Sequence, residues 1–235
     1  MSDLSSQPER NREGAKPSKA LTLKGQRTRS AILDAAERQF AERGFEGVSL
    51  RQIMDEASVQ MGQMQYYFPT KDSVFSSVIE RRLDDVNRAY QEAVESLDIL
   101  ALRGKVDLPL VIRAVTAASR AWLSAPDIGR HRYLRMLALS TMSFDQPEYV
   151  RRHGETFRPL NEHIVAAISH CFPDARPTRV RAAYHLIETN LLSIYVNIDA
   201  LLQRSGISRS TEAVHALYDD LESFLVGGVE QLLGR

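Results

Sequence analysis

The sequence is poor in cysteine, glycine and proline, and it has no long apolar run. Its single cysteine, Cys171, excludes an internal disulfide and fits a reducing compartment such as the cytoplasm. No stretch of about 18 apolar residues occurs, so we expect no membrane span, and the first residues lack the apolar core of a signal peptide. With 12 glycines and 9 prolines in 235 residues, and no alternating β-branched runs, the composition favours helices over sheets.

The sequence also lacks an excess of either charge. Its formal net charge is zero, so any nucleic-acid binding must come from locally concentrated charge. Residues 1–29 carry seven lysines and arginines against three acids. Residues 1–24 are polar and show no helical periodicity, which predicts a flexible basic arm. The 43% hydrophobic content of the whole chain is enough for a packed core.

Helical periodicity then runs through the rest of the chain and predicts an all-α fold of about nine helices. The first, "RTRSAILDAAERQFAERGF", ends at Gly44. The second, "SLRQIMDEAS", begins with a capping box, and the third ends at Phe68-Pro69. Thr70 caps a long fourth helix whose apolar stripe reaches Leu97. Five longer helices are expected near residues 108–124, 127–143, 147–172, 177–204 and 211–233.

The second and third helices, joined by a tight turn, match a helix-turn-helix unit, whose second helix enters the DNA major groove. On a helical wheel, Met64 and Phe68 of the third helix share one side, which we expect to face the core. The opposite side carries amide, phenol and glycine, and glutamine can pair with the N6/N7 edge of adenine. The alternative is an ordinary exposed amphipathic helix. The candidate side chains for DNA are Met61, Gly62, Gln63, Gln65, Tyr66 and Tyr67.

Residues of about 28–75 resemble the N-terminal domain of the TetR family of transcriptional regulators. The resemblance is carried by "ILDAAERQFAERGFEGVSLRQIMDEASVQMGQMQYYFPTKDSVF". It implies a DNA-binding domain over residues 25–71 and a ligand-binding and dimerisation domain over 72–235. It further implies that Met61, Gly62, Gln65 and Tyr66 meet bases, and that Gln63, Tyr67 and Lys71 meet phosphates.

The DNA-binding set is completed by two residues at the start of the second helix, Ser49 and Arg51, while Arg27 and Arg29 are weaker phosphate candidates that could equally be solvated. Lys71 could also be a solvated residue at a helix start. The sequence departs from the usual family pattern at four positions, which leaves the operator sequence open. They are Ser58 where glycine is common, Gln60 where a capping serine is common, Gln65 where tyrosine is common and Tyr67 where histidine is common.

The last two predicted helices carry apolar stripes too broad for one neighbour, which suggests a partner subunit. The resemblance implies a symmetric homodimer through a four-helix bundle, so that two reading helices meet a pseudo-palindrome. Gly227-Gly228 would permit close helix approach, or could mark a local break. The expected interface residues are Ile187, Leu191, Ile194, Ile198, Leu217, Leu221, Phe224 and Leu225.

The middle helices are expected to hold a pocket for a small organic effector. The candidates are Trp122, Tyr133, Met136, Met142, Phe144, Phe157, His163, Tyr184 and Glu188, each of which could equally be plain core. Basic clusters around Arg130 and Arg151 could meet an anionic ligand such as an acyl thioester of coenzyme A, or could form solvated helix faces. By the resemblance, the ligand favours a dimer state with wrongly spaced heads, and operator affinity falls.

No sequence motif indicates catalysis or a cofactor. Glycine-rich phosphate loops, H-E-x-x-H and nucleophile elbows are missing, and no set of histidines and acids converges on a metal site. Cys171 would need an activated thiolate to act as a redox sensor. The helix-turn-helix pattern and the TetR resemblance together imply a cytoplasmic, nucleoid-associated repressor. The alternatives are a DNA-bound dimer that acts through a protein partner, as nucleoid-occlusion factors do, and an all-helical enzyme.

Overall fold

The structure is a computed structural model that describes residues 22–102, 106–143 and 148–234, apart from some side chains of two helices, α5 and α8. Within these ranges it contains ten helices and no strand, which confirms the predicted all-α class. The helices are α1 (Leu23–Arg43), α2 (Leu50–Ala57), α3 (Met61–Tyr67), α4 (Lys71–Glu80), α5 (Leu83–Leu102), α6 (Leu108–Ser124), α7 (Ile128–Thr141), α8 (Glu148–Cys171), α9 (Pro177–Arg204) and α10 (Thr211–Leu233).

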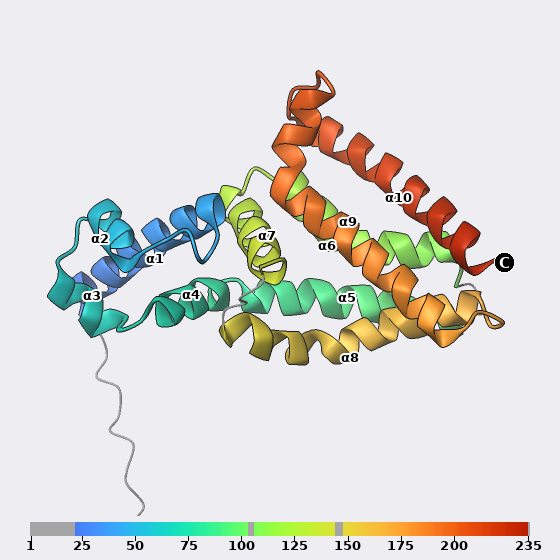
Figure 1. Cartoon of the computed structure of the whole chain (residues 1–235), viewed down its shortest axis with the longest axis horizontal. Helices are drawn as coiled ribbons and strands as arrows, with labels where there is room; N and C mark the ends of the chain where they lie inside the picture. The colour runs from blue at the N-terminus through green and yellow to red at the C-terminus, as the bar shows by residue number, and fades with distance from the viewer. Residues whose placement is uncertain (1–21, 103–105, 144–147, 235) are drawn as a thin grey trace, which may run out of the picture.

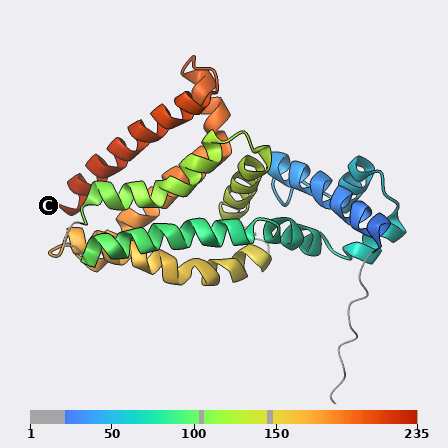
Figure 2. The same ribbon diagram turned by 180° about the vertical axis from the view of Figure 1, so that it is seen from behind.

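The molecule has a small head at one end and a larger body at the other (Figure 1). Helices α1 to α4 form the head, and α5 to α10 form the body. From behind, α6 lies between α5 and α10, with α8 on the outer side of α5 (Figure 2). Helix α7 packs against α1 of the head and α9 of the body, so it sits at the joint between the two parts.

Three phenylalanines hold the head together. Phe40 of α1 lies 5.2 Å from Phe75 of α4, and Phe45 lies 5.1 Å from Phe75, measured between ring centroids in edge-on contacts. Such pairs stabilise beyond their buried area. Because Phe75 belongs to this cluster, α4 packs as part of the head, and a domain boundary at residue 71 falls inside one packed unit.

The single long fourth helix predicted from Thr70 onward is wrong. The α-helix stops at Glu80 and restarts at Leu83, and the Arg82 N–H donates to the Ile79 carbonyl at 3.1 Å, three residues back instead of four. Two adjacent arginines explain the break, because Arg81 pairs with α1 whereas Arg82 pairs with the loop before α7. The new helix starts with acids at Asp84 and Asp85, which suits the positive end of the helix dipole.

The other predicted elements match the structure closely. The bounds of α6, α9 and α10 are those predicted, and each end of α7 and α8 differs from the prediction by one or two residues. Gly44, with φ of 71°, follows α1 in the left-handed region that glycine enters easily. Thr22 caps α1 with its hydroxyl, so the helix starts just inside the predicted arm, most of which lies outside the described residues.

None of the described helices is long and apolar enough to cross a membrane.

Candidate DNA interface and ligand cavity

The turn between α2 and α3 is built from caps encoded in the sequence. The Ser49 hydroxyl accepts from the Gln52 N–H at 3.3 Å, and the Gln52 side-chain carbonyl accepts from the Ser49 N–H at 2.7 Å, which confirms the predicted capping box. At the other end of α2, Ser58 takes φ of 54° and ψ of 43°. This left-handed residue reverses the chain so that α3 can cross α2.

Two anchors fix α3 on the head, as predicted from the helical wheel. Met64 is fully buried and Phe68 is 2% exposed, and both belong to the core that includes Ile32 and Ile53. The guanidinium of Arg29 lies 5.3 Å from the centre of the Phe68 ring, where it covers the end of the helix. Arg29, a weak phosphate candidate from sequence, therefore supports the reading helix from behind.

The opposite face of α3 is open to solvent at the outer end of the head (Figure 1). Tyr66 is 73% exposed and Met61 is 52% exposed, and Gln65 is exposed beside them. A side chain at Gly62 would meet nothing within 4 Å, so the backbone is bare there. These four residues, the predicted base-contacting set, share one unobstructed surface. Tyr67 is half-buried and packs edge-on against Tyr66 at 4.9 Å.

Two residues predicted to contact phosphates, Gln63 and Lys71, form hydrogen bonds within the chain. The side-chain carbonyl of Gln63 accepts from the Gln60 N–H at 3.0 Å, so it caps its own helix. The ammonium of Lys71 donates to the Phe45 carbonyl at 3.0 Å and lies 4.2 Å from the centre of the Phe45 ring. Local sequence pattern could not predict this contact, because 26 residues separate its partners. Ser49 and Arg51 are exposed at the start of α2.

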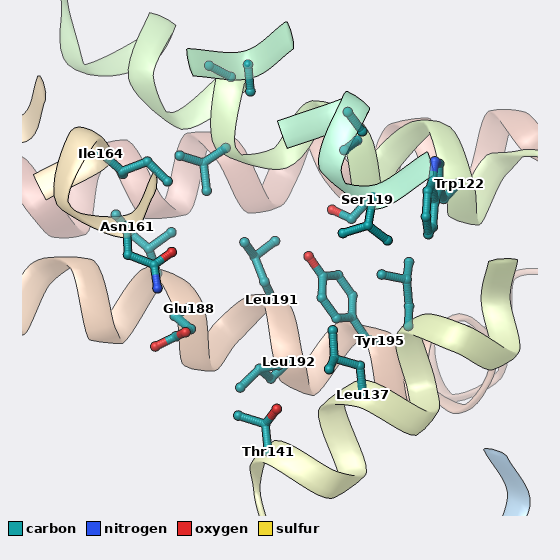
Figure 3. A pocket seen from close by; sticks show the side chains of 18 of the residues that line it. Ser119, Trp122, Leu137, Thr141, Asn161, Ile164, Glu188, Leu191, Leu192 and Tyr195 are labelled. Carbon is teal, nitrogen blue, oxygen red and sulfur yellow. The ribbon is translucent and has the colours of Figure 1, made fainter. Parts of the chain in front are cut away.

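A cavity of about 350 Å³ opens inside the body between α5, α6, α7, α8 and α9. Four of the predicted pocket residues line it, namely Trp122, Tyr133, Tyr184 and Glu188. Figure 3 shows Asn161 and Glu188 toward one end, Trp122 at the other, and Tyr195 between them. Most of the remaining lining is aliphatic, including Leu134, Leu137, Ile164, Ile187, Leu191 and Leu192.

The other predicted pocket residues lie elsewhere. Met136 is fully buried and does not line the cavity, and His163 is exposed with its Nδ1 3.0 Å from the Pro159 carbonyl. Met142 lines a second hollow of about 350 Å³ at the joint between head and body. Phe144 and the side chain of Phe157 lie outside the described residues. Helical spacing identified apolar faces but could not say which cavity each face borders.

The cavity wall is tied to α10 by polar groups. Ser119, which lines the cavity, accepts a hydrogen bond from the buried Tyr218 hydroxyl at 2.9 Å. Burial raises the pKa of Tyr218 well above its usual value, so this phenol stays neutral and donates. One turn away, Thr116 donates to Glu222 at 2.6 Å. The last helix is therefore fastened to the same face of α6 that borders the cavity.

The aromatic end of the cavity connects to the joint with the head. Trp122 packs edge-on against Tyr133 at 5.9 Å, and the guanidinium of Arg130 lies 5.4 Å from the centre of the Trp122 ring. Arg130 also lies 3.6 Å from Asp127, whose carboxylate accepts from Arg82 at 3.0 and 3.4 Å. Burial alone would raise the pKa of Asp127, but Arg82 and the α7 amides hold that pKa below its usual value.

Gly129 leaves the space in which Arg82 reaches Asp127. A Cβ at Gly129 would lie 2.0 Å from the Arg82 Nη2 atom. On the head side of the joint, Arg81 donates to Asp34 of α1 at 2.8 Å. Arg130 is thus engaged at this joint, and neither it nor its basic neighbours His131, Arg132 and Arg135 line the cavity.

The predicted dimer stripe is mostly internal to one chain. Six of its residues are at most 8% exposed within the single chain, namely Ile187, Leu191, Ile194, Ile198, Leu221 and Leu225. Leu217 is half-buried, and Phe224 is 67% exposed. Ile187 and Leu191 line the ligand cavity. The broad stripe therefore reflects two neighbours within the chain, which helical periodicity cannot distinguish from a partner subunit.

Large apolar side chains nonetheless remain exposed on α9 and α10, and we call this part of the surface the outer face. It contains Leu186, 56% exposed, and Phe224. Side chains placed at Gly227 or Gly228 would meet nothing within 4 Å, so α10 is bare beside Phe224.

The described residues hold no group of three histidines, cysteines, aspartates or glutamates that could bind a metal ion. Cys171 is half-buried, and burial together with nearby Asp107 raises its pKa, which disfavours the thiolate that redox sensing requires.

Two family models divide the chain much as the structure does. Residues 32–78 match the model described as bacterial regulatory proteins of the tetR family, and residues 113–228 match the tetracyclin repressor-like C-terminal domain. The chain belongs to the TetR family of transcriptional regulators. As a member of this family, it is a ligand-responsive DNA-binding regulator and no enzyme.

Named relatives span the chain to different extents. The dual transcriptional regulator CecR of Shigella flexneri is 22% identical over 80% of this chain and 84% of its own. The repressor KstR2 of Rhodococcus jostii is 35% identical over 29% of this chain and 33% of its own. The fold resembles Bacillus subtilis FadR, solved with stearoyl-CoA, at a TM-score of 0.54 and 17% identity, covering 85% of this chain and 98% of FadR. TetR regulators bind operator DNA as dimers and take small ligands.

Proposed function

We propose that this protein is a homodimeric repressor that reads a pseudo-palindromic operator through α3. A small organic effector enters the cavity between α5 and α9 and releases the operator. The protein acts in the cytoplasm, where its DNA partner lies. The observation that carries this proposal is the outer surface of α3, which presents Gln65, Tyr66 and Met61 to solvent while Met64 and Phe68 anchor the same helix from below.

The chemistry of α3 suits base reading. A glutamine amide can donate to and accept from adenine in the major groove, and a tyrosine can bond a phosphate or pack on a thymine methyl. The bare backbone at Gly62 allows close approach to the groove wall. Ser49 and Arg51 are exposed at the start of α2, which supports a role for them in contacting the adjacent phosphates.

A dimer supplies the second reading head. We assign the interface to the outer face of α9 and α10, where Phe224 and Leu186 are exposed and Gly227-Gly228 permits close helix contact. The buried residues of the earlier stripe support this face from inside the chain. Two heads then sit on half-sites about 34–36 Å apart.

Release requires a mechanical link from the cavity to the head, and we propose that ion pairs at the joint provide it. The Trp122 ring at the cavity wall packs against the Arg130 guanidinium. Arg130 and Arg82 both pair with Asp127. Arg82 directly follows Arg81, which forms an ion pair with Asp34 of α1. A ligand that shifts Trp122 would therefore act on the break between α4 and α5, and differential affinity of about 1–3 kcal/mol between the two states gives a useful switch.

A test first selects bound duplexes from a random pool and then compares two variants on the selected site. We expect Gln65→Ala to relax base preference at one position per half-site, at a cost of about 1–3 kcal/mol there. Arg51→Ala, an exposed cation on α2, should instead weaken all sequences evenly and reduce the salt slope by about one.

Equal, sequence-blind losses for the two variants would contradict base reading by Gln65. Failure to enrich any duplex from the pool would contradict the proposed operator itself. Lys71→Ala is a poorer probe because Lys71 also holds Phe45, so its effect on DNA mixes with an effect on the head.

A further inference from the structure

The described residues that line the cavity carry negative charge and no positive charge. Among its described lining residues, Glu188 is the one with a formal charge, and no lysine, arginine or histidine contributes. The Glu188 side chain is 41% exposed, and the exposed His185 on the same helix lies beside it, with 3.4 Å between Nδ1 and Oε2. Among the described side chains, the Glu188 carboxylate at the cavity therefore forms no ion pair with a lysine or arginine.

The rest of the cavity lining offers aromatic rings and one amide. Trp122, Tyr133, Tyr184 and Tyr195 all border the space. Aromatic faces attract cations, and the Trp122 ring already carries the Arg130 guanidinium at 5.4 Å. Asn161 lies toward the Glu188 end, where its carbonyl can accept from a donor (Figure 3).

The two ends of the cavity also differ in the residues that line them. Glu188 makes one end of the cavity electronegative, whereas Trp122 lies toward the other end (Figure 3) and packs there against Arg130, which is itself paired with Asp127. A positive group therefore gains most beside Glu188, and an apolar group fits between Leu191, Leu137 and the aromatic end. The volume of about 350 Å³ suits a small molecule.

We propose that the effector is an amphipathic monocation, an organic amine or quaternary ammonium, whose charged end binds at Glu188 and Asn161. An anionic ligand would bury its charge beside a carboxylate, or in apolar surroundings, which is costly. The described lining also offers no cation for the phosphates of an acyl thioester of coenzyme A. This assignment rests on the proposed role of the cavity as the effector site.

The test compares three probes that share one tail, namely octyltrimethylammonium, 1-octanol and octanoate. Binding to the full-length protein is measured by titration calorimetry and by the shift in Tm. We expect the cation to bind at least tenfold more tightly than either other probe. Glu188→Gln, nearly isosteric and half-exposed, should cost roughly tenfold in affinity for the cation and leave the affinity for octanol unchanged. Glu230→Gln on exposed α10 surface is the matched control and should change neither.

Preference for octanoate, failure of the cation to bind at millimolar concentration, or equal cation affinity in Glu188→Gln and the parent would each overturn the assignment. Operator release is read separately. If the cation binds through Glu188 but does not lower operator affinity, the ligand class stands and the effector role of the cavity fails.

Discussion

At the residue scale, the turn of the reading head carries a conformational cost. Ser58 lies in the left-handed region, which is unfavourable for residues with a Cβ, and the resemblance had marked it as a position where glycine is common. Its side chain is exposed, so replacing it removes no core contact.

We expect Ser58→Gly to raise the free energy of unfolding by about 0.5–1 kcal/mol, because the left-handed strain outweighs the entropy that glycine adds to the unfolded chain. Denaturant unfolding measures the change. Ser58→Ala keeps the strain and should give no gain. A glycine variant no more stable than the alanine variant would show that the turn is unstrained.

At the scale of elements, a buried acid lies where α1 meets the break between α4 and α5. Glu37 is 9% exposed, and its carboxylate lies 3.8 Å from Arg81. Burial raises the pKa of Glu37 above the ordinary value of 4.5, although Arg82 and Arg81 oppose the rise. The folded chain therefore holds this proton to a higher pH than the unfolded chain does, and stability is lost as the pH rises through that range.

We expect Glu37→Gln, which cannot ionise, to unfold with a higher free energy than the parent at pH 7. The difference should close as the pH falls below about 4, where both states of the parent are protonated. Arg81 keeps its partner Asp34 in this variant. Denaturant titrations across this pH range measure the effect, with Glu42→Gln on the exposed side of α1 as control. A difference that does not vary with pH would contradict the linkage.

The joint between head and body gives a second prediction about elements. Gly129→Ala pushes the Arg82 guanidinium off Asp127 without changing any charge. We expect operator affinity to fall by up to about 1 kcal/mol, roughly fivefold, because the head is less firmly placed. Asp127→Asn should act in the same direction, since asparagine still caps α7 but pairs weakly with Arg82.

Operator titration without ligand measures both variants. The control is Arg181→Ala, which removes a bidentate ion pair with Glu162 between α8 and α9, away from the joint. Loss of operator affinity in the control to the same degree would show a general effect of surface charge. Parent-like affinity in Gly129→Ala would remove the ion pairs from the proposed link.

At the scale of the whole molecule, DNA binding depends on pairing two chains. We expect Phe224→Glu to give the mass of one chain by light scattering, because it places a charge on the outer face without touching the core. Operator affinity should then fall by about 10²–10⁴, since the two heads no longer bind together. Leu23→Glu, also at an exposed apolar residue, should remain a dimer. A dimeric Phe224→Glu protein would place the interface elsewhere.

The sequence by itself determined most helix bounds, the capping box of α2 and which face of α3 is buried. Capping residues and proline or glycine stops act within a few residues, so the bounds of α9 and α10 and the anchors Met64 and Phe68 could be predicted from local spacing. Only the tertiary structure decided what each face meets. Periodicity predicts that Ile187 and Leu191 are buried, but three-dimensional packing places them at a cavity of their own chain.

Tertiary structure also decided the break between α4 and α5 at Arg81 and Arg82. Local pattern favours one long helix there, and the break arises because these neighbours pair with acids 47 and 45 residues away. The Asp84-Asp85 pair, which favours a helix start, was a sign of the break in the sequence. Contacts between distant segments depend on how the helices pack, and that packing decided the joint, the cavity and the side on which Glu188 stands.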